Sequence, residues 1–260
     1  MNDHLTDHLS KTEKKIEDYP SLQQLPKVYS QSDPKLIKLI QDKFLIPPPS
    51  SGEYNLQRQA SITAQSRVVR EVLNDKSNGF FIECGALDGE ARSNSLFLEK
   101  NNNWQGILIE GDPGSWKSVI SKNRRRSWFL PTCLSLKTET MFATFASRGH
   151  VGQIISHPEK YKKHREEWFN VTCFPLYSIL LALGNPTVDY FSLDIEGDEL
   201  AVLKTIPFDK VDIKVLSVEI IHGGERGDGP NDLDDYMKSQ GYTFYGKQSY
   251  DHMFVKNDLI

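Results

Sequence analysis

Strand-length apolar segments alternate with helix-length segments after Gly79, and this alternation constrains the fold more than any other feature of the sequence. The apolar segments are, in chain order, Phe80–Cys84, Gly106–Glu110, Trp128–Pro131, Val188–Asp194 and Val215–Ile220. The helix-length segments between them are Ser93–Lys100, Ser115–Asn123, Leu176–Leu183 and Asp198–Thr205. Such alternation is typical of βαβ units around a parallel sheet. A last helix over Asp232–Gln240 and two strands in a row, Tyr242–Tyr245 and His252–Lys256, predict a closing antiparallel hairpin. The sequence therefore predicts an α/β, Rossmann-like domain over residues 79–258.

The first third of the chain lacks this alternation. Residues 1–30 are polar and charged with few apolar side chains, so we expect a mobile arm there. Residues 31–78 are expected to form a helical extension, because Asp33 and Pro34 are typical of a helix start and Ser61–Asn74 predicts a second helix. Between these helices, Pro47–Gly52 is expected to form a linker.

The composition limits the partners of the chain. The net charge is −4, and the one run of basic residues, Arg124–Arg126, is interpreted as a solvated helix end, so no nucleic-acid partner is expected. The N-terminus lacks the apolar core of a signal peptide, and the longest apolar-rich stretch, Phe174–Leu183, is too short to span a bilayer. As the chain stands, these features predict a soluble, cytoplasmic protein without a membrane span.

The three cysteines, Cys84, Cys133 and Cys173, are far apart and have apolar neighbours. Their spacing is not that of a metal site, and buried free thiols are the default prediction. A Cys133–Cys173 bridge is the alternative if the chain folds in an oxidising compartment. The triplet Asn170-Val171-Thr172 is a glycosylation sequon, which only a lumenal location would make usable.

The end of the first predicted strand carries the strongest signal for a ligand. Glu83 ends the strand, and Gly85 and Gly89 lie in the loop that leads to the next helix. Glycines allow a tight turn and a close approach to a ligand at the carboxyl ends of the strands. The spacing is not that of the three-glycine pyrophosphate loop. Glu83 and Asp88 instead suit a cofactor that carries an ammonium and a sulfonium group; a turn without a ligand is the alternative.

Acidic residues also follow the later strands. Glu110 ends the second strand, where an acid is placed to accept hydrogen bonds from both hydroxyls of a ribose, although it could be a plain strand end. Asp198 and Glu199 suit the first turn of a helix. Asp194 and Glu196 could instead steady a sulfonium, take up a substrate proton or hold a divalent cation.

The fifth strand adds Glu219 and His222 to the same edge of the predicted sheet. His222 is a candidate general base, with a surface histidine as the alternative. Asp194 and Glu219 lie at neighbouring strand ends and could supply part of an Mg²⁺ site. The ligand pattern is incomplete, so we expect no metal and keep Mg²⁺ as the less favoured option.

Three motifs together resemble the FkbM-type S-adenosylmethionine (SAM)-dependent methyltransferases. They are Glu83-Cys84-Gly85-Ala86-x-x-Gly89, Glu110-x-x-Pro113 and Asp194-Ile195-Glu196-Gly197-x-Glu199, and the resemblance runs from about Phe80 to Val255. It implies a class I fold with a seven-stranded sheet, SAM as cofactor, and methyl transfer to an oxygen, such as a hydroxyl of a small molecule or glycan. The implied cofactor-binding residues are Glu83, Gly85, Ala86, Asp88, Gly89, Asn94, Glu110, Gly111, Asp112, Cys133, Leu134 and Asp194. The implied catalytic residues are Asp194, Glu196 and His222.

Within this family the chain looks closest to the animal Star-like branch. The shared marks are Gly85–Glu90, Ser93–Phe97 and Pro175–Leu181. Star-like proteins are associated with moving growth-factor precursors from endoplasmic reticulum to Golgi, and they usually carry a membrane anchor, which this sequence lacks. The branch therefore implies an alternative: a non-catalytic trafficking protein with a secreted-protein cargo, located in the ER or Golgi lumen. Leu87 stands where the enzymes commonly have Asn.

Overall fold

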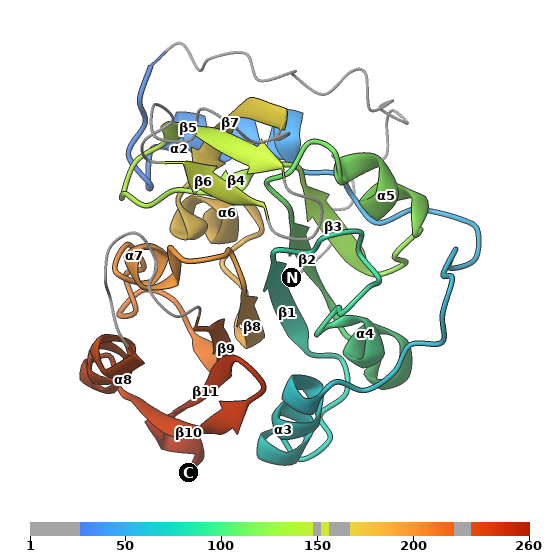
Figure 1. Cartoon of the computed structure of the whole chain (residues 1–260), viewed down its shortest axis with the longest axis vertical. Helices are drawn as coiled ribbons and strands as arrows, with labels where there is room; N and C mark the ends of the chain where they lie inside the picture. Colours follow the sequence, from blue (N-terminus) through green and yellow to red (C-terminus); the bar gives the residue numbers. More distant parts are fainter. Residues whose placement is uncertain (1–26, 148–151, 156–166, 221–229) are drawn as a thin grey trace.

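The computed structural model of the protein describes residues 27–147, 152–155, 167–220 and 230–260. Its main sheet has seven strands in the order β10-β11-β9-β8-β1-β2-β3 (Figure 1). The strands are β1 (Phe80–Cys84), β2 (Gln105–Ile109), β3 (Ser127–Leu130), β8 (Val188–Leu193), β9 (Ile213–Glu219), β10 (Tyr242–Gln248) and β11 (Asp251–Lys256). Strands β3, β2, β1, β8 and β9 are parallel, whereas β11 is antiparallel to both neighbours. The predicted Rossmann-like, mostly parallel sheet with a C-terminal antiparallel hairpin is thereby confirmed.

Helices cover both faces of this sheet. Successive side chains of a strand point to opposite faces, and in β1 Ile82 belongs to one apolar cluster while Phe81 belongs to the other. The first cluster includes α6 (Leu176–Ala182), α7 (Glu199–Leu203) and α8 (Pro230–Ser239). The second includes α3 (Ala64–Val72), α4 (Leu96–Asn102) and α5 (Trp116–Ser121). Figure 1 shows these two groups of helices on either side of the sheet. No helix in the described part of the chain is long and apolar enough to cross a membrane.

The predicted helical extension packs into the first cluster. Helix α2 (Pro34–Leu39) begins where the sequence predicts, with the Asp33 side chain accepting a hydrogen bond from the Lys35 N–H at 2.8 Å. It continues as a π-helical turn, η2 (Ile40–Phe44), whose Phe44 ring lies 4.8 Å from that of Phe174. The extension is therefore part of the core and not a separate unit.

The predicted arm differs from the structure at its C-terminal end. Residues 1–26 lie outside the described residues, but Tyr29 is only 9% exposed and belongs to the first cluster. Its N–H donates to the Thr140 hydroxyl at 2.9 Å, and its carbonyl accepts from the Thr140 N–H at 2.8 Å. An aromatic anchor at residue 29 thus holds a segment that we expected to be mobile.

A second, four-stranded sheet was not predicted from the sequence. Its order is β4 (Cys133–Leu134), β7 (Glu167–Phe174), β5 (Met141–Ser147) and β6 (Gln153–Ile155). It lies between β3 and α6 in the chain, and Figure 1 shows it at the end of the main sheet opposite the β10–β11 hairpin. Its inner face carries a small apolar cluster that includes Phe145, Val171 and Cys173.

The cysteines correct the default prediction of free thiols. Cys133 and Cys173 lie opposite each other in the β4–β7 pair and form a disulfide. The structure therefore has the Cys133–Cys173 bridge, which was the alternative prediction for an oxidising compartment. Cys84 is a buried free thiol at the end of β1, as expected.

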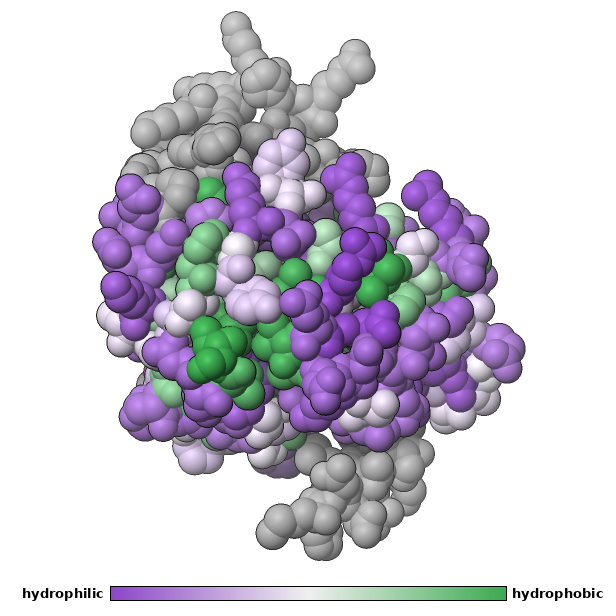
Figure 2. Space-filling model, turned by 90° about the horizontal axis from the view of Figure 1, so that it is seen from below, coloured by the Kyte–Doolittle hydropathy of each residue, from purple (hydrophilic) through white to green (hydrophobic). Residues whose placement is uncertain are grey.

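The β10–β11 end of the main sheet leaves apolar side chains at the surface. Figure 2 shows this end of the molecule, with green apolar groups among purple polar ones. Large hydrophobic side chains are exposed in the hairpin and in the C-terminal turn η4 (Asn257–Leu259) and the residue after it. They are Phe244, Tyr245, Tyr250, Leu259 and Ile260. Among the described strands β10 is the edge strand at this end, so these groups border a strand edge that pairs with no other described strand.

Candidate active-site cleft

A cleft of about 1100 Å³, including space open to solvent, lies at the carboxyl ends of β1, β2, β8 and β9. The chain passes from β1 outward to β3 and then returns to β8 on the other side of β1, so the cleft lies where the strand order reverses. The predicted site residues that line it are Glu83, Gly85, Asn94, Glu110, Gly111, Asp112, Cys133, Leu134, Asp194 and Glu196. The four-stranded sheet forms a further wall through Phe145 and Ile154, together with Gly152 just before β6, and none of the three was predicted from the sequence.

Gly85 allows two strand ends to meet at the bottom of the cleft. Its φ is +77°, and a Cβ atom there would lie 1.9 Å from the carbonyl oxygen of Asp194. The Asp194 N–H donates to the Cys84 carbonyl, which closes the same contact from the other side. Only glycine fits both the positive φ and this close approach.

Glu83 lines the cleft but its carboxylate is largely occupied. It accepts hydrogen bonds from the Ser93 hydroxyl at 2.8 Å, from the Asn94 N–H at 2.7 Å and from the Ser95 hydroxyl. The Asn94 amide in turn donates to Ser192 at the end of β8, at 3.1 Å. Glu83 therefore fixes the segment that enters α4 and presents Asn94 to the cleft.

Three predicted cofactor residues are placed beside the cleft and do not line it. Asp88 accepts from the N–H groups of Glu90 at 2.9 Å and Ala91 at 2.7 Å, and lies 3.5 Å from the Lys122 ammonium. Burial tends to raise the pKa of Asp88, but these bonds and the lysine charge outweigh it and lower the pKa. Ala86 is buried in the second apolar cluster, and Gly89 lies against α5. These residues shape the loop and do not touch the cavity.

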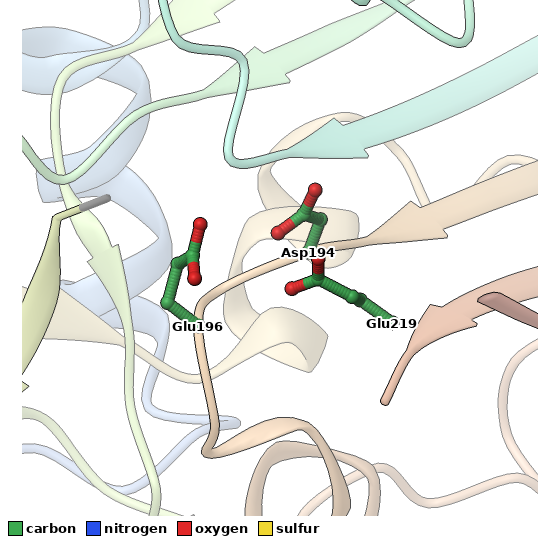
Figure 3. A group of neighbouring side chains, drawn as sticks. All are labelled: Asp194, Glu196 and Glu219. Carbon is green, nitrogen blue, oxygen red and sulfur yellow. The ribbon is translucent and has the colours of Figure 1, made fainter. Parts of the chain in front are cut away.

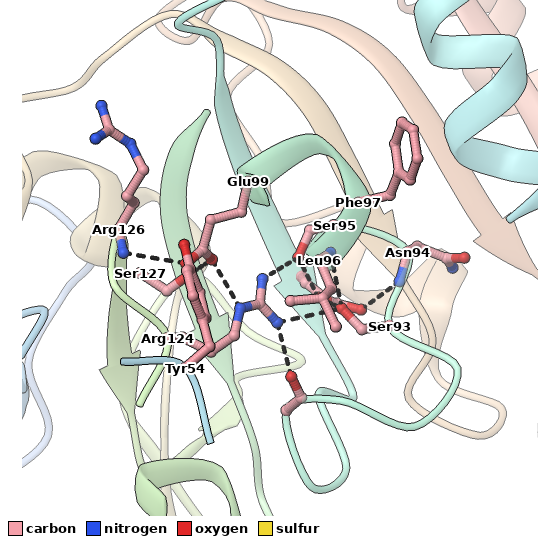
Figure 4. A network of polar contacts seen from close by, with 12 residues as sticks. Tyr54, Ser93, Asn94, Ser95, Leu96, Phe97, Glu99, Arg124, Arg126 and Ser127 are labelled. Carbon is pink, nitrogen blue, oxygen red and sulfur yellow. Dashed lines mark hydrogen bonds and ion pairs between the residues drawn. The ribbon is translucent and has the colours of Figure 1, made fainter. Parts of the chain in front are cut away.

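Arg124 corrects the interpretation of the basic run as a solvated helix end. Its side chain is only 3% exposed and forms an ion pair with buried Glu99 at 2.7 Å (Figure 4). The guanidinium also donates to the Gly89 carbonyl at 2.8 Å and to the Ser95 hydroxyl at 3.0 Å. Ser95 donates to Glu83, so this network links α4 and the segment before β3 to the loop that lines the cleft.

Leu87 and Glu110 connect the first two strand ends. The Leu87 N–H donates to one carboxylate oxygen of Glu110 at 2.7 Å, and the Asp112 N–H donates to the other at 2.7 Å. Burial raises the pKa of Glu110 to about 7 against these two bonds, and the charges of Asp112 and Asp194 add to the rise. Leu87 has a φ of +53°, which a leucine adopts at a cost of roughly 1–2 kcal/mol.

The apolar wall of the cleft begins at Gly111. A Cβ atom on Gly111 would lie 2.9 Å from the Phe145 ring and 3.4 Å from the Cys133 side chain, so the backbone runs directly under the ring. Asp112 holds this arrangement, because its carboxylate accepts from the Ser147 hydroxyl at 2.6 Å at the end of β5. Gly111, Cys133 and Phe145 thus form an apolar slot beside Glu110, together with Leu134 and Ile154.

Three carboxylates meet at the opposite side of the cleft. Asp194 follows β8, Glu219 ends β9 and Glu196 lies in the loop after β8, with their oxygen atoms within 4.8 Å of one another (Figure 3). Hydrogen bonding links Asp194 and Glu219, which lie at the ends of neighbouring strands. The spacing of the three groups would allow them to hold a metal ion.

Burial raises the proton affinity of all three groups, and the close approach adds to this for Glu196 and Glu219. Burial and the charge of Asp194 raise the pKa of Glu219 to about 9, and burial raises the pKa of Asp194. The pKa of Glu196 is also raised, by burial and then by Asp194, although the Arg92 charge opposes this. The charge of Asp194 and the hydrogen bond between the two groups thus favour the protonated form of Glu219.

Glu199, by contrast, stabilises the loop that follows β8. Its carboxylate accepts from the N–H groups of Ile195 at 3.0 Å and Gly197 at 3.1 Å, which fixes the turn that carries Glu196. Burial raises the pKa of Glu199 to about 7 in spite of these bonds. His222, the remaining predicted catalytic residue, lies outside the described residues.

The charges around the cleft indicate what it can bind. Among the described residues that line it, seven are acidic: Glu83, Glu110, Asp112, Asp194, Glu196, Asp198 and Glu219. Arg92 is the one lysine or arginine in that set, and sequence reasoning missed it because the flanking motif is acidic. An anionic pyrophosphate would be repelled here, whereas a ligand with two cationic groups and one carboxylate, as in SAM, matches the set.

Comparisons with known proteins agree with this arrangement. The family model described as methyltransferase FkbM domain matches residues 83–244, which runs from the end of β1 into β10 and includes the cleft-lining residues and the four-stranded sheet. No curated protein matches the chain.

Several solved structures are similar to the chain at low identity. The FkbM methyltransferase from Methylobacillus flagellatus KT is 15% identical with a TM-score of 0.41, over 70% of this chain and 44% of that one. Precorrin-6y C5,15-methyltransferase from Geobacter metallireducens GS-15 is 11% identical with a TM-score of 0.38, over 80% of this chain and 100% of that one. Phosphoethanolamine N-methyltransferase 1 from Haemonchus contortus, solved with phosphoethanolamine and S-adenosylhomocysteine, is 9% identical with a TM-score of 0.35, over 76% of this chain and 41% of that one. The chain thus spans less than half the length of the first and third of these proteins.

Proposed function

Because the chain belongs to the FkbM methyltransferase family, we propose that it transfers a methyl group from SAM to an oxygen of a small molecule or glycan. The observation that carries this proposal is the acidic cleft at the strand-order reversal, with three carboxylates close together on one side of it. Bound SAM supplies an electrophilic methyl group on a sulfonium. What the protein must add is a complementary cleft, a base and an aligned acceptor.

The cleft offers a matching partner for each part of the cofactor. Glu110 retains lone pairs beyond those used by its two backbone donors, which suits the hydroxyls of a ribose. The slot formed by Gly111, Phe145 and Leu134 suits a flat adenine ring. Arg92 at the mouth suits the carboxylate of the amino-acid end. The predicted roles of Ala86, Asp88 and Gly89 become indirect, because these residues shape the loop.

Asp194 is the proposed general base. An acceptor hydroxyl must lose its proton as the methyl group arrives, and a carboxylate with a raised pKa is a better base than an ordinary one. Protonated Glu219 stabilises the ionised form of Asp194 by donating to it. Glu196 lies at the mouth, where it can orient a hydroxyl-bearing acceptor. Alignment of the hydroxyl with the methyl group would contribute most of the rate. His222 stays a predicted alternative base.

A divalent cation is the alternative occupant of the three carboxylates. Mg²⁺ needs few protein ligands and keeps several waters, so Asp194, Glu196 and Glu219 would suffice to hold it. A bound cation would displace the shared proton and lower the pKa of a coordinated hydroxyl. Turnover that is unchanged by excess EDTA would exclude this alternative.

Calorimetric titration with SAM and NAD tests the cofactor assignment. SAM should bind and NAD should not, and the absence of heat at millimolar SAM would overturn the proposal. The Arg92→Ala variant sharpens the test. It should weaken binding of S-adenosylhomocysteine about tenfold, as expected when a charged hydrogen bond of about 1.5 kcal/mol is lost. Methylthioadenosine lacks the carboxylate and should bind both proteins equally.

A methyl-transfer screen over hydroxylated small molecules and glycans then separates the enzyme from a trafficking protein of the Star-like kind. The enzyme should transfer label from SAM, and Asp194→Asn should abolish transfer while SAM still binds. A protein that binds SAM but transfers no methyl group, and instead retains a growth-factor precursor, would favour the trafficking function. The Star-like branch and its lumenal location stay predictions until that result.

A further inference from the structure

We propose that Asn170 carries an N-linked glycan and that the chain accordingly folds in the lumen of the secretory pathway. The sequon Asn170-Val171-Thr172 lies within β7, and its middle residue is not proline. Alternate side chains of a strand share a face. The Val171 side chain points into the inner cluster, whereas the Asn170 side chain is exposed on the outer face. A glycan on that amide would leave the backbone pairing with β5 intact.

The disulfide is an independent observation that points to the same compartment. Cys173, the residue after the sequon, is bonded to Cys133 of the adjacent strand. Disulfides persist in oxidising compartments and are rare in the cytosol, where thiols are kept reduced. The secretory lumen is also where the machinery for N-glycosylation is found, so the same location accounts for both features. This argument does not depend on methyl transfer.

The outer face of the four-stranded sheet supplies a surface for the sugar. Trp168 lies two residues before Asn170 on the same face and is 40% exposed. Phe142 of β5 is paired with Thr172 and is 39% exposed. Two exposed aromatic rings thus flank Asn170 on either side along the sheet. The apolar face of the first sugar can cover such rings, which otherwise form an exposed apolar patch.

The modification is a group transfer that requires one co-reactant, an oligosaccharide linked to a lipid diphosphate. The Asn170 amide nitrogen forms a bond to the anomeric carbon of the first sugar, and the bond from that carbon to the diphosphate oxygen breaks. The amide loses one proton and the lipid diphosphate leaves. The Thr172 hydroxyl completes the sequon that the transferase recognises.

The test uses the protein expressed in eukaryotic cells from its complete coding sequence. Digestion with an amidase that releases N-glycans should increase the electrophoretic mobility of the parent and convert Asn170 to Asp in the peptide spanning β7. Asn170→Gln should migrate like the digested parent and be insensitive to the enzyme. Thr172→Ser preserves the sequon and is the matched control, which should keep the shift.

Alkylation under denaturing, non-reducing conditions provides the second measurement. Cys84 should be the one cysteine modified, with Cys133 and Cys173 modified only after reduction. An unmodified Asn170 peptide from the full-length protein would overturn the glycan assignment, whatever the state of the cysteines. Alkylation of Cys133 and Cys173 without reductant would overturn the lumenal location.

Discussion

Replacing Gly85 by Ala tests whether the close contact between β1 and β8 builds the cleft. At a φ of +77°, an alanine costs roughly 1–2 kcal/mol. The added Cβ would also lie 1.9 Å from the Asp194 carbonyl oxygen, where such contacts essentially never fall below 3.0 Å. Overpacking of this kind costs about 1–3 kcal/mol, because the backbone must move. We therefore expect Gly85→Ala to lower the free energy of unfolding by about 2–5 kcal/mol, as the sum of the two effects.

Gly241→Ala is the matched control for this prediction. Its φ is +86° and nothing lies within 4 Å of the Cβ position, so only the conformational cost of roughly 1–2 kcal/mol applies. Urea unfolding measures both losses, and SAM titration of the folded proteins measures the effect on the cleft. Gly85→Ala should lose SAM binding while Gly241→Ala keeps it. Equal stability of the two variants, with equal SAM affinity, would refute the close-contact argument.

Three further predictions concern loop strain, the carboxylate pair and the buried ion pair. Leu87→Asn should raise the free energy of unfolding by about 0.5–1 kcal/mol, since Asn tolerates the left-handed region better; a melting curve that shifts downward would contradict this. For Glu219, the folded pKa of about 9 lies above the ordinary 4.5, so the folded state retains a proton that the unfolded state loses. Urea unfolding should therefore show that the free energy of unfolding falls as the pH rises from 4.5 to about 9. The slope should be less than about 1.4 kcal/mol per pH unit because solvent screens the pair, and Glu219→Gln should make it less steep. Arg124→Met should cost about 3–5 kcal/mol by leaving Glu99 buried without its cation, and Arg124→Met combined with Glu99→Gln should recover part of that loss in the same assay.

The main sheet could be predicted from the sequence because its parallel strands are buried on both faces. Such strands are short continuous apolar runs, and Phe80–Cys84 was predicted with the same bounds as β1. The four-stranded sheet gave no comparable signal. Its β4 has two residues and β6 has three, so each is too short to show a period. Strand β4 is defined by its pairing with distant β7 and β6 by its pairing with β5, and such pairing is a tertiary effect.

Acids at the strand ends could be predicted because topology alone brings the carboxyl ends of parallel strands together. Asp194, Glu196 and Glu110 accordingly line one cleft. Their individual roles could not be predicted, since these depend on donors from other elements. Asp88 is held by backbone N–H groups and Lys122.

The basic residue Arg124 is a second case in which the sequence does not reveal the partner of a charged side chain. Its neighbours in sequence are basic and polar, and that pattern is typical of a surface. The carboxylate that allows it to be buried belongs to Glu99, 25 residues earlier in the chain. The pattern of charges along the sequence does not show that Glu99 lies beside Arg124 in the fold.

The central position of β1 has a consequence for synthesis of the chain. The Phe80 N–H at the start of β1 donates to the carboxylate of Asp189 in β8, and these residues are 109 positions apart. Ribosomes add roughly 5–20 residues per second, so one edge of β1 waits for about 5–20 s before its partner strand emerges. During that interval β1, β2 and β3 can assemble while an apolar strand edge stays open to other nascent chains. The yield of folded protein in a heterologous host should therefore increase with chaperones that shield nascent chains and with a lower growth temperature. Changes in the N-terminal residues should have a smaller effect on it.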